Sequence, residues 1–183
     1  HLPLTEEAKK EAAEIMLSSH NILKPATGEP VATPGLDIVF GCYYITQVDE
    51  STKVHKIVFS SPQEAKLSYE YGEVGLHQKV NVLIGADRIE TSVGRIVFNE
   101  VVPEKIPYVN NVTGKKALKD IVSQCFYLYG SEKTSEMLDD MMQLGFEYAT
   151  KSGMSWALDD LPDLPVKKDI LEKAQLEVDQ IHE

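Results

Sequence analysis

The chain has 183 residues, of which 43% are hydrophobic, and its formal net charge is −11 at pH 7. This length suits a single domain that can bury about 70% of its unfolded surface, and the composition excludes wholesale disorder. An acidic surface repels phosphate groups, so the net charge disfavours a surface on this chain that binds duplex DNA. The acidic residues are spread along the sequence, and we interpret most of them as a solvated surface.

The first predicted element is a helix that begins after Thr5. The Thr5 hydroxyl can cap it, and Glu6 and Glu7 are favourable at the positive end of the helix dipole. One narrow apolar stripe follows at helical spacing: Ala8, Ala12, Ile15 and Met16.

A long connection follows, because three prolines forbid regular structure there: Pro25, Pro30 and Pro34. The next run, "IVFGCYYIT" (residues 38–46), is apolar but ambiguous in type. Its β-branched and aromatic residues favour a buried strand, whereas Asp37 as an N-cap favours a buried helix. Periodicity does not decide between them.

The middle of the chain predicts a small antiparallel sheet. Residues 53–59 alternate with a period of two, and residues 79–84 and 89–93 read as a hairpin that turns at 85–88. Between them, residues 61–72 predict a short helix. Ser61 caps it, Pro62 occupies its first position and Glu64 completes a capping box.

From residue 114 onward the pattern is helical, with a break near Gly130 and Ser131. The first apolar stripe consists of Ala117, Leu118, Ile121, Val122, Cys125 and Leu128. The second consists of Met137, Leu138, Met141, Met142 and Phe146, in which we interpret the methionines as core filler. After an irregular segment, the final helix, 167–183, carries a seam at coiled-coil spacing: Leu171, Ala174, Val178 and Ile181. The sequence thus predicts an α+β protein that is mostly helical.

The sequence shows no self-contained catalytic motif. The five histidines have no zinc spacing, and "NNVTGKK" lacks the first glycine and the Ser/Thr of a phosphate loop. Asp159, Asp160 and Asp163 could bind a cation weakly, but a solvated acidic loop explains them better. We therefore predict no metal ligand in this chain, and a small metal-dependent hydrolase is disfavoured.

Cys42 and Cys125 are far apart in apolar surroundings, which indicates two buried free thiols in a reducing compartment. No signal-peptide core and no apolar run of about 18 residues is visible, so we expect a cytoplasmic protein with no membrane partner.

Several long blocks, in the same order, resemble the beta' family, the largest catalytic subunit of bacterial RNA polymerase. They are "HLPL" followed by a helix, "NILKPATGEP", "GCYYIT", "TSVGRIVFNEVVPEKIPYVN", "KKALKDIV", "GFEYATKSGMSWALDDL" and "KKDILEKAQLEVDQI". The resemblance covers nearly the whole chain and is weakest at residues 47–90. It implies a fragment of a larger multidomain subunit, which fits the missing initial methionine.

The resemblance places the chain just downstream of the catalytic aspartate motif of that family. It implies that residues 1–165 form the pore region beside the secondary channel and that residues 166–183 begin the coiled coil on the channel rim. The magnesium-binding aspartates would precede His1, so the fragment alone would be inactive and hold no cofactor. The implied partners are the beta, alpha and omega subunits, DNA, RNA and nucleoside triphosphates in the whole enzyme, and regulatory factors at the rim.

Three polar residues are candidates for lining that channel: Asn21, Lys24 and Arg95. Each has a structural alternative. Asn21 could brace the loop backbone, Lys24 could be a solvated lysine, and Arg95 could make a structural ion pair.

The chain also departs from the family at three positions. Gly35 and Leu36 replace the usual Ser-Gln pair, so no role is carried onto Leu36, and Trp156 stands at an aliphatic position. A competing interpretation is a stand-alone acidic α+β adaptor that binds a partner helix through the 166–183 seam.

Overall fold

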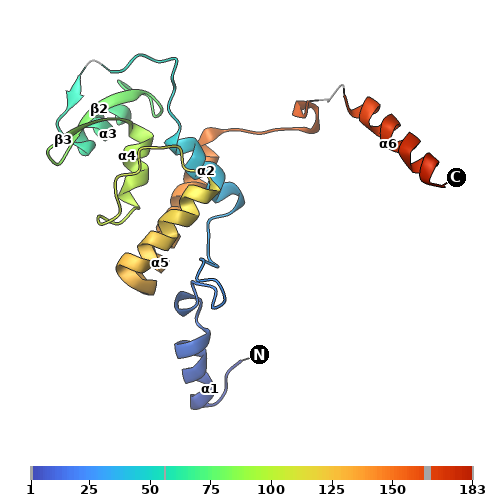
Figure 1. Ribbon diagram of the computed structural model, residues 1–183. Helices are drawn as coiled ribbons and strands as arrows, with labels where there is room; N and C mark the ends of the chain where they lie inside the picture. The colour runs from blue at the N-terminus through green and yellow to red at the C-terminus, as the bar shows by residue number, and fades with distance from the viewer. Residues whose placement is uncertain (1, 56, 163–165, 183) are drawn as a thin grey trace. The chain divides into compact units, whose positions relative to one another are not determined.

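The computed structural model describes residues 2–55, 57–162 and 166–182 (Figure 1). The chain divides into two compact units, His1–Gly153 and Met154–Glu183. The helices are α1 (Glu6–Glu11), α2 (Leu36–Thr46), α3 (Pro62–Glu70), α4 (Val93–Glu100), α5 (Lys115–Ser152) and α6 (Lys167–His182). The strands are β1 (Val58–Phe59), β2 (Lys79–Ile84) and β3 (Asp87–Ser92). This mainly helical architecture with a small sheet confirms the predicted α+β class.

The ambiguous apolar run forms helix α2. Its N-cap is Gly35 and not Asp37, which instead lies in the first turn. Along α2, Cys42 and Ile45 are fully buried. A strand would have sent alternate side chains to opposite faces, whereas a helix lets these apolar residues pack around one axis against other helices. The packing partners of α2 thus decide what its sequence leaves open.

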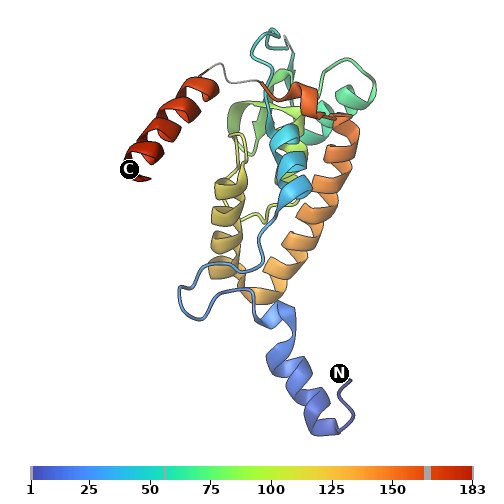
Figure 2. The same ribbon diagram turned by 90° about the vertical axis from the view of Figure 1, so that its right-hand side faces the viewer.

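Helix α5 is a hairpin of two helical segments that turn at Gly130, where the sequence predicts a break. Gly130 has φ 82° and ψ −173°, a conformation that glycine adopts without steric cost. Figure 2 shows the two segments side by side, with α2 packed against them. Buried side chains of α2, α4 and both segments form the main core: Cys42, Ile45, Phe98, Leu118, Val122, Cys125, Met137 and Met141.

The two predicted stripes of α5 are only partly buried. Met137 and Met141 are core filler, as predicted, with exposed fractions of 1% and 0%. The stripe predictions are wrong at their edges, because Leu128, Met142 and Phe146 are exposed. A helix at the edge of a small core turns part of any wide apolar stripe toward solvent.

Glycines bring the helices of this core unusually close together. A Cβ atom on Gly41 of α2 would lie 1.8 Å from the carbonyl oxygen of Gly145 in α5. A Cβ atom on Gly94 of α4 would lie 1.9 Å from the carbonyl oxygen of Ile45 in α2. Neither position has room for a side chain, so backbone meets backbone at both crossings.

The sheet has the order β1-β2-β3 and is mixed. The predicted hairpin is confirmed: β2 and β3 are antiparallel, with Val80 opposite Thr91 and Val82 opposite Ile89. β1 pairs parallel with β2. The prediction of an antiparallel sheet is therefore wrong for β1. A second core lies between the sheet, α3 and α4: Phe59, Ala65, Val74, Val80, Val82, Val93 and Ile96.

The predicted strand at 53–59 is wrong for most of its length, since only Val58 and Phe59 form a strand. Phe59 is buried but Ile57 is 59% exposed, so the expected alternation of faces fails. Lys56, which the same prediction includes, lies outside the described residues. The cap of α3 is close to the prediction: Ser61 Oγ accepts from the Glu64 backbone N–H. The Glu64 carboxylate, however, accepts from the backbone N–H and hydroxyl of Ser60.

The first helix is capped as predicted, because the Thr5 hydroxyl accepts from the Ala8 backbone N–H at 3.2 Å. After α1 the chain continues as a π-helical turn, Ala12–Met16, and a 3-10 turn, Ser18–His20. The apolar stripe predicted for this helix does not pack against a core, since Ile15 and Met16 are 65% and 75% exposed.

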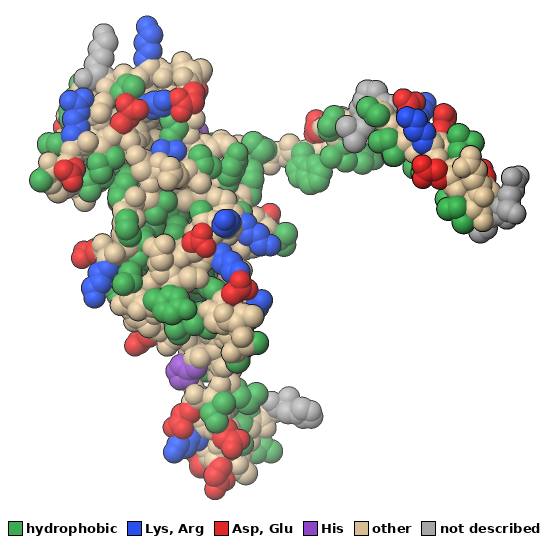
Figure 3. Space-filling model, in the orientation of Figure 1, with side chains coloured by type: hydrophobic (Ala, Val, Ile, Leu, Met, Phe, Trp, Pro, Cys, Tyr) green, Lys and Arg blue, Asp and Glu red, His purple; other side chains and the backbone are tan. Residues whose placement is uncertain are grey.

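The second unit consists of a 3-10 turn, Leu158–Asp160, and helix α6, which confirms the predicted final helix. Its hydrophobic side chains are largely exposed, as the space-filling view shows (Figure 3). The predicted seam of α6 lies among them: Leu171, Ala174, Val178 and Ile181. Over the described ranges, no helix combines the length and the apolar character needed to span a membrane.

Candidate functional site

Arg95 is positioned where β3 passes directly into α4. Ser92 caps α4, and its hydroxyl accepts a hydrogen bond from the Arg95 backbone N–H at 3.3 Å. The Arg95 Nε–H donates to the carbonyl of Thr46, the last residue of α2, at 3.0 Å. Carbonyls at a helix C-terminus lack intrahelical partners and carry the negative end of the dipole. The guanidinium therefore stabilises the end of α2.

Two asparagines extend this network to the segment after α4. The side chain of Asn110 accepts from Arg95 Nη1 at 3.2 Å and donates to the Glu90 carbonyl at 2.8 Å. Asn99 donates to the carbonyls of Arg95 and Val109, and it accepts from the Val109 N–H at 2.8 Å. Together these bonds hold β3, α4 and the 107–113 segment in one arrangement.

The predicted structural role of Arg95 is thus present, but not as an ion pair. Its described acceptors are neutral oxygens, and none of the ion pairs among the described residues includes it. Burial lowers the pKa of Arg95, and the nearby Tyr108 and Glu50 oppose this shift. Neutral acceptors suffice because a guanidinium offers five donors that can each satisfy a backbone or amide oxygen.

A polar cavity of about 220 Å³ opens beside Arg95. Its lining residues are Val48, Glu50, Lys79, Glu90, Thr91, Arg95 and Asn110. Lys79 forms an ion pair with Glu50, and this hydrogen bond raises the pKa of Lys79. In the lining, the positive charges of Lys79 and Arg95 are balanced by the carboxylates of Glu50 and Glu90, so the cavity carries no excess positive charge. It is therefore poorly suited to attracting a phosphate group.

Asn21 braces the turns that precede it, the structural alternative that the sequence left open. Its side-chain Nδ2 donates to the carbonyls of Ile15 at 2.7 Å and Leu17 at 3.0 Å. Its own backbone N–H donates to the Ser18 carbonyl. Both amide hydrogens of the side chain are thereby used, which leaves its oxygen for other contacts.

Lys24 lies on an exposed turn that Glu29 closes. The Lys24 backbone N–H donates to the Glu29 carbonyl at 2.8 Å. The Lys24 Nζ atom lies 3.9 Å from Glu29 Oε2. The Glu29 carboxylate bonds more closely to Lys119 of α5, at 2.8 Å, and this hydrogen bond lowers the pKa of Glu29. Sequence reasoning missed the Glu29–Lys119 pair, because no local pattern links residues so far apart.

The structure places the three candidates in two places. Asn21 follows the Ser18–His20 turn, which lines a cavity with residues 131–139 of α5, and Lys24 lies near Glu29, which is bonded to Lys119 of α5. Arg95 instead lies where β3 meets α4. No hydrogen bond or ion pair between described residues joins Arg95 to either of the others. Asn21, Lys24 and Arg95 therefore do not form one site.

Both cysteines are free and buried, as the sequence predicts. Burial raises the pKa of the Cys42 thiol to about 12. A thiol with this pKa is neutral at physiological pH and a poor nucleophile, so Cys42 serves as a small apolar core residue.

The family description "RNA polymerase Rpb1, domain 3" matches residues 21–161, which include α2 to α5 and the whole sheet. The chain belongs to this family. The Rpb1 domain 3 stretch therefore contains all three candidate residues and both cores.

Several RNA polymerase beta' subunits are similar to almost the whole chain. It is 41% identical over 99% of its length to the DNA-directed RNA polymerase subunit beta' of Desulforamulus reducens. It is 42% identical to the protein of that name from Pelotomaculum thermopropionicum and 41% identical to that of Thermosipho africanus, over 100% of the chain in both cases. The chain spans only 15%, 16% and 11% of these three relatives.

Proposed function

We propose that this chain is part of the catalytic beta' subunit of a bacterial DNA-directed RNA polymerase and lines the secondary channel beside the active centre. One observation supports this above all: the likeness to subunits of that name extends over 99% of the chain at 41% identity. The position beside the channel rests on the resembling blocks around "NILKPATGEP" and "TSVGRIVFNE". The activity of the whole subunit is thus proposed here by likeness.

On this proposal the chain contributes structure, and other residues perform the chemistry. In the described part of the chain, no three His, Cys, Asp or Glu side chains are grouped so that they could hold a metal ion. These residues do not fit the magnesium site on which phosphoryl transfer by polymerases depends. We assign the magnesium ligands to residues outside this chain and derive no metal-dependent step from it.

The proposed partners follow from the same assignment. They are the beta, alpha and omega subunits, together with DNA, RNA and nucleoside triphosphates in the whole enzyme, in the cytoplasm. The exposed apolar side chains of α6 support a helical partner for this element, because an isolated helix of this length is marginal in water. Regulatory factors at the channel rim would dock near it.

Of the three candidate residues, Lys24 is the one we propose to face nucleotide phosphates. Both side-chain N–H groups of Asn21 bond to protein oxygens, and Arg95 lies beside a cavity whose charges balance. The Lys24 ammonium is half exposed and only loosely paired, at 3.9 Å from Glu29. It is therefore free to contribute positive potential to a passing anion.

A chimeric polymerase tests the proposal. Residues 1–183 replace the matching stretch of the Desulforamulus reducens beta' subunit, and template-dependent RNA synthesis is measured with magnesium. We expect the chimera to assemble and to synthesise RNA, while the 183-residue chain alone incorporates no nucleotide. In the chimera, Lys24→Gln should raise the KM for nucleotides about two- to threefold with little change in kcat. Lys10→Gln is the matched control, since Lys10 is exposed and lies 3.9 Å from Glu14.

The competing function, an acidic adaptor that grips a partner helix through α6, is favoured by the same exposed seam. It predicts a different outcome: the chimera fails to assemble, and the isolated chain binds an apolar helical peptide through α6. Synthesis by the isolated chain above that of a mock preparation would contradict both functions.

A further inference from the structure

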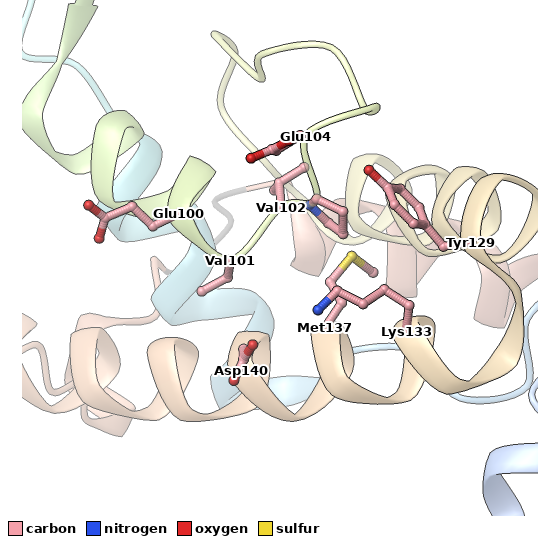
Figure 4. Close-up of a pocket in the computed structure, with 9 residues that line it drawn as sticks. Glu100, Val101, Val102, Glu104, Tyr129, Lys133, Met137 and Asp140 are labelled. Atoms are coloured by element: carbon pink, nitrogen blue, oxygen red, sulfur yellow. The ribbon is translucent and has the colours of Figure 1, made fainter. Parts of the chain in front are cut away.

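A second cavity, of about 340 Å³, opens where the end of α4 meets both segments of the α5 hairpin (Figure 4). Its apolar lining comes from Val101, Val102 and Pro103 after α4 and from Met137 of α5. Pockets for small ligands measure roughly 300–1,000 Å³, so this volume lies at the small end of the range. It suits one long side chain better than a large ligand.

Charged residues surround this apolar floor, and three of the four are acidic: Glu100, Glu104, Asp140 and Lys133. Glu100 is neutralised by Lys66 at 2.7 Å, and Lys133 bonds to Glu136 at 2.8 Å. Asp140 acts on Lys133 only at longer range, as a lesser cause of its raised pKa. Glu104 and Asp140 form no ion pair with any residue that the structure describes.

The two unpaired carboxylates belong to different elements. Glu104 lies on the loop after α4 and Asp140 on the second segment of α5, with Val102 and Met137 between them in the close-up (Figure 4). An apolar floor between two carboxylates complements a side chain with an aliphatic stem and a cationic head. Arginine fits best, because its planar guanidinium is weakly hydrated and its donors can bond both oxygens of one carboxylate.

We propose that this cavity accepts an arginine side chain presented by a partner polypeptide. The stem lies over Val102 and Met137, and the guanidinium bonds to Asp140 at the edge of this floor. The net charge of −11 favours basic partners, because opposite charge speeds encounter and selects against acidic surfaces. The inference goes beyond the proposed polymerase role and does not depend on it, since every residue that carries it lies in the first unit.

The test is a titration of the 183-residue chain with N-acetyl-L-arginine methylamide, followed by NMR of the methyl groups of Met137 and Val102. The neutral analogue N-acetyl-L-citrulline methylamide has nearly the same shape and serves as the control ligand. We expect saturable shifts at both methyl groups with the arginine compound, and binding at least about fivefold weaker with the citrulline compound.

Two variants separate a specific contact from the general charge of the chain. Asp140→Asn should weaken binding of the arginine compound about three- to fivefold. Asp139→Asn removes the same charge from the adjacent residue, which does not line this cavity, and should leave binding unchanged. An unchanged methyl spectrum without ligand shows that each variant is folded. The proposal is overturned if the citrulline compound binds as well, if both variants weaken binding equally, or if neither methyl group shifts.

Discussion

Gly41 of α2 and Gly145 of α5 touch through their backbones. A Cβ atom built on Gly41 would lie 1.8 Å from the Gly145 carbonyl oxygen, and one built on Gly145 would lie 2.8 Å from the Ile38 backbone. This contact sets how closely α2 approaches the hairpin that carries most of the main core. The core depends on two residues that have no side chains.

We therefore expect Gly41→Ala to destabilise the protein by about 3 kcal/mol or more, because backbone atoms cannot move aside cheaply. Inside a helix the same substitution ordinarily stabilises by up to about 1 kcal/mol, so the sign itself is informative. Urea unfolding followed by circular dichroism measures it. Gly75→Ala is the control, since a Cβ atom there meets only Gln78 at 3.7 Å. A neutral Gly41→Ala would mean that the helices do not cross here.

Thr46 of α2 and Thr113 before α5 form a buried polar link. The Thr46 hydroxyl donates to the Cys42 carbonyl at 2.7 Å and accepts from the Thr113 N–H at 2.9 Å. Thr46→Val keeps the shape but leaves the Thr113 N–H without its acceptor, which should cost about 1–3 kcal/mol of unfolding free energy. Thr150→Val removes the same kind of bond, to the Phe146 carbonyl, on an exposed helix face and should cost under about 0.5 kcal/mol. Equal losses would contradict the buried link.

Arg95 should matter for stability through its geometry as well as its charge. Arg95→Lys keeps the positive charge but cannot bond both the Thr46 carbonyl and Asn110, so we expect a loss of about 1–2 kcal/mol. Thermal unfolding at two salt concentrations checks this, because bonds to neutral acceptors should depend little on salt. Arg88→Lys is the matched control, at an exposed position whose side chain hydrogen-bonds to Asn81. A strong salt dependence of the loss would indicate an ion pair instead.

The Glu29–Lys119 pair predicts a pH dependence of defined sign. The pKa of Glu29 lies below the ordinary value of 4.5, chiefly through the Lys119 hydrogen bond. A depressed carboxyl pKa contributes stability above the unfolded value, and this contribution is lost as pH falls through the folded value. An NMR titration of Glu29 should show its midpoint below 4.5, and Lys119→Gln should raise it toward 4.5. Lys24→Gln should raise it less, since Lys24 is the smallest of the causes; the reverse order would refute this assignment.

Cys42 predicts a second pH effect, of opposite sign. Its folded pKa of about 12 lies above the ordinary 9.0, so its contribution to stability is complete below pH 9.0 and is lost as pH rises toward 12. Cys42→Ala should flatten the fall in stability across this range relative to the unsubstituted protein. In the folded protein at pH 8, iodoacetamide should leave Cys42 unmodified, as mass spectrometry can check. Rapid alkylation without unfolding would show that the thiol is accessible.

Elements with strong local signals could be predicted from the sequence. Thr5 and Ser61 cap helices and Gly130 breaks a long helix, because each depends on neighbours within a few residues. The hairpin turn falls within the predicted residues 85–88, although β3 already begins at Asp87. The order of the resembling blocks likewise indicates the polymerase family, and the family match over residues 21–161 confirms it. Cap, turn and block order are local or linear properties, which a sequence displays directly.

Tertiary structure decided the features that depend on distant residues. It made "IVFGCYYIT" a helix, because Gly145 and Gly94 let α5 and α4 pack against it, and it cut the 53–59 strand to two residues beside β2. It also gave Arg95 neutral partners from α2 and the 107–113 segment and joined Glu29 to Lys119. Period and composition describe one segment at a time, whereas burial and hydrogen bonding depend on which segments the fold brings together.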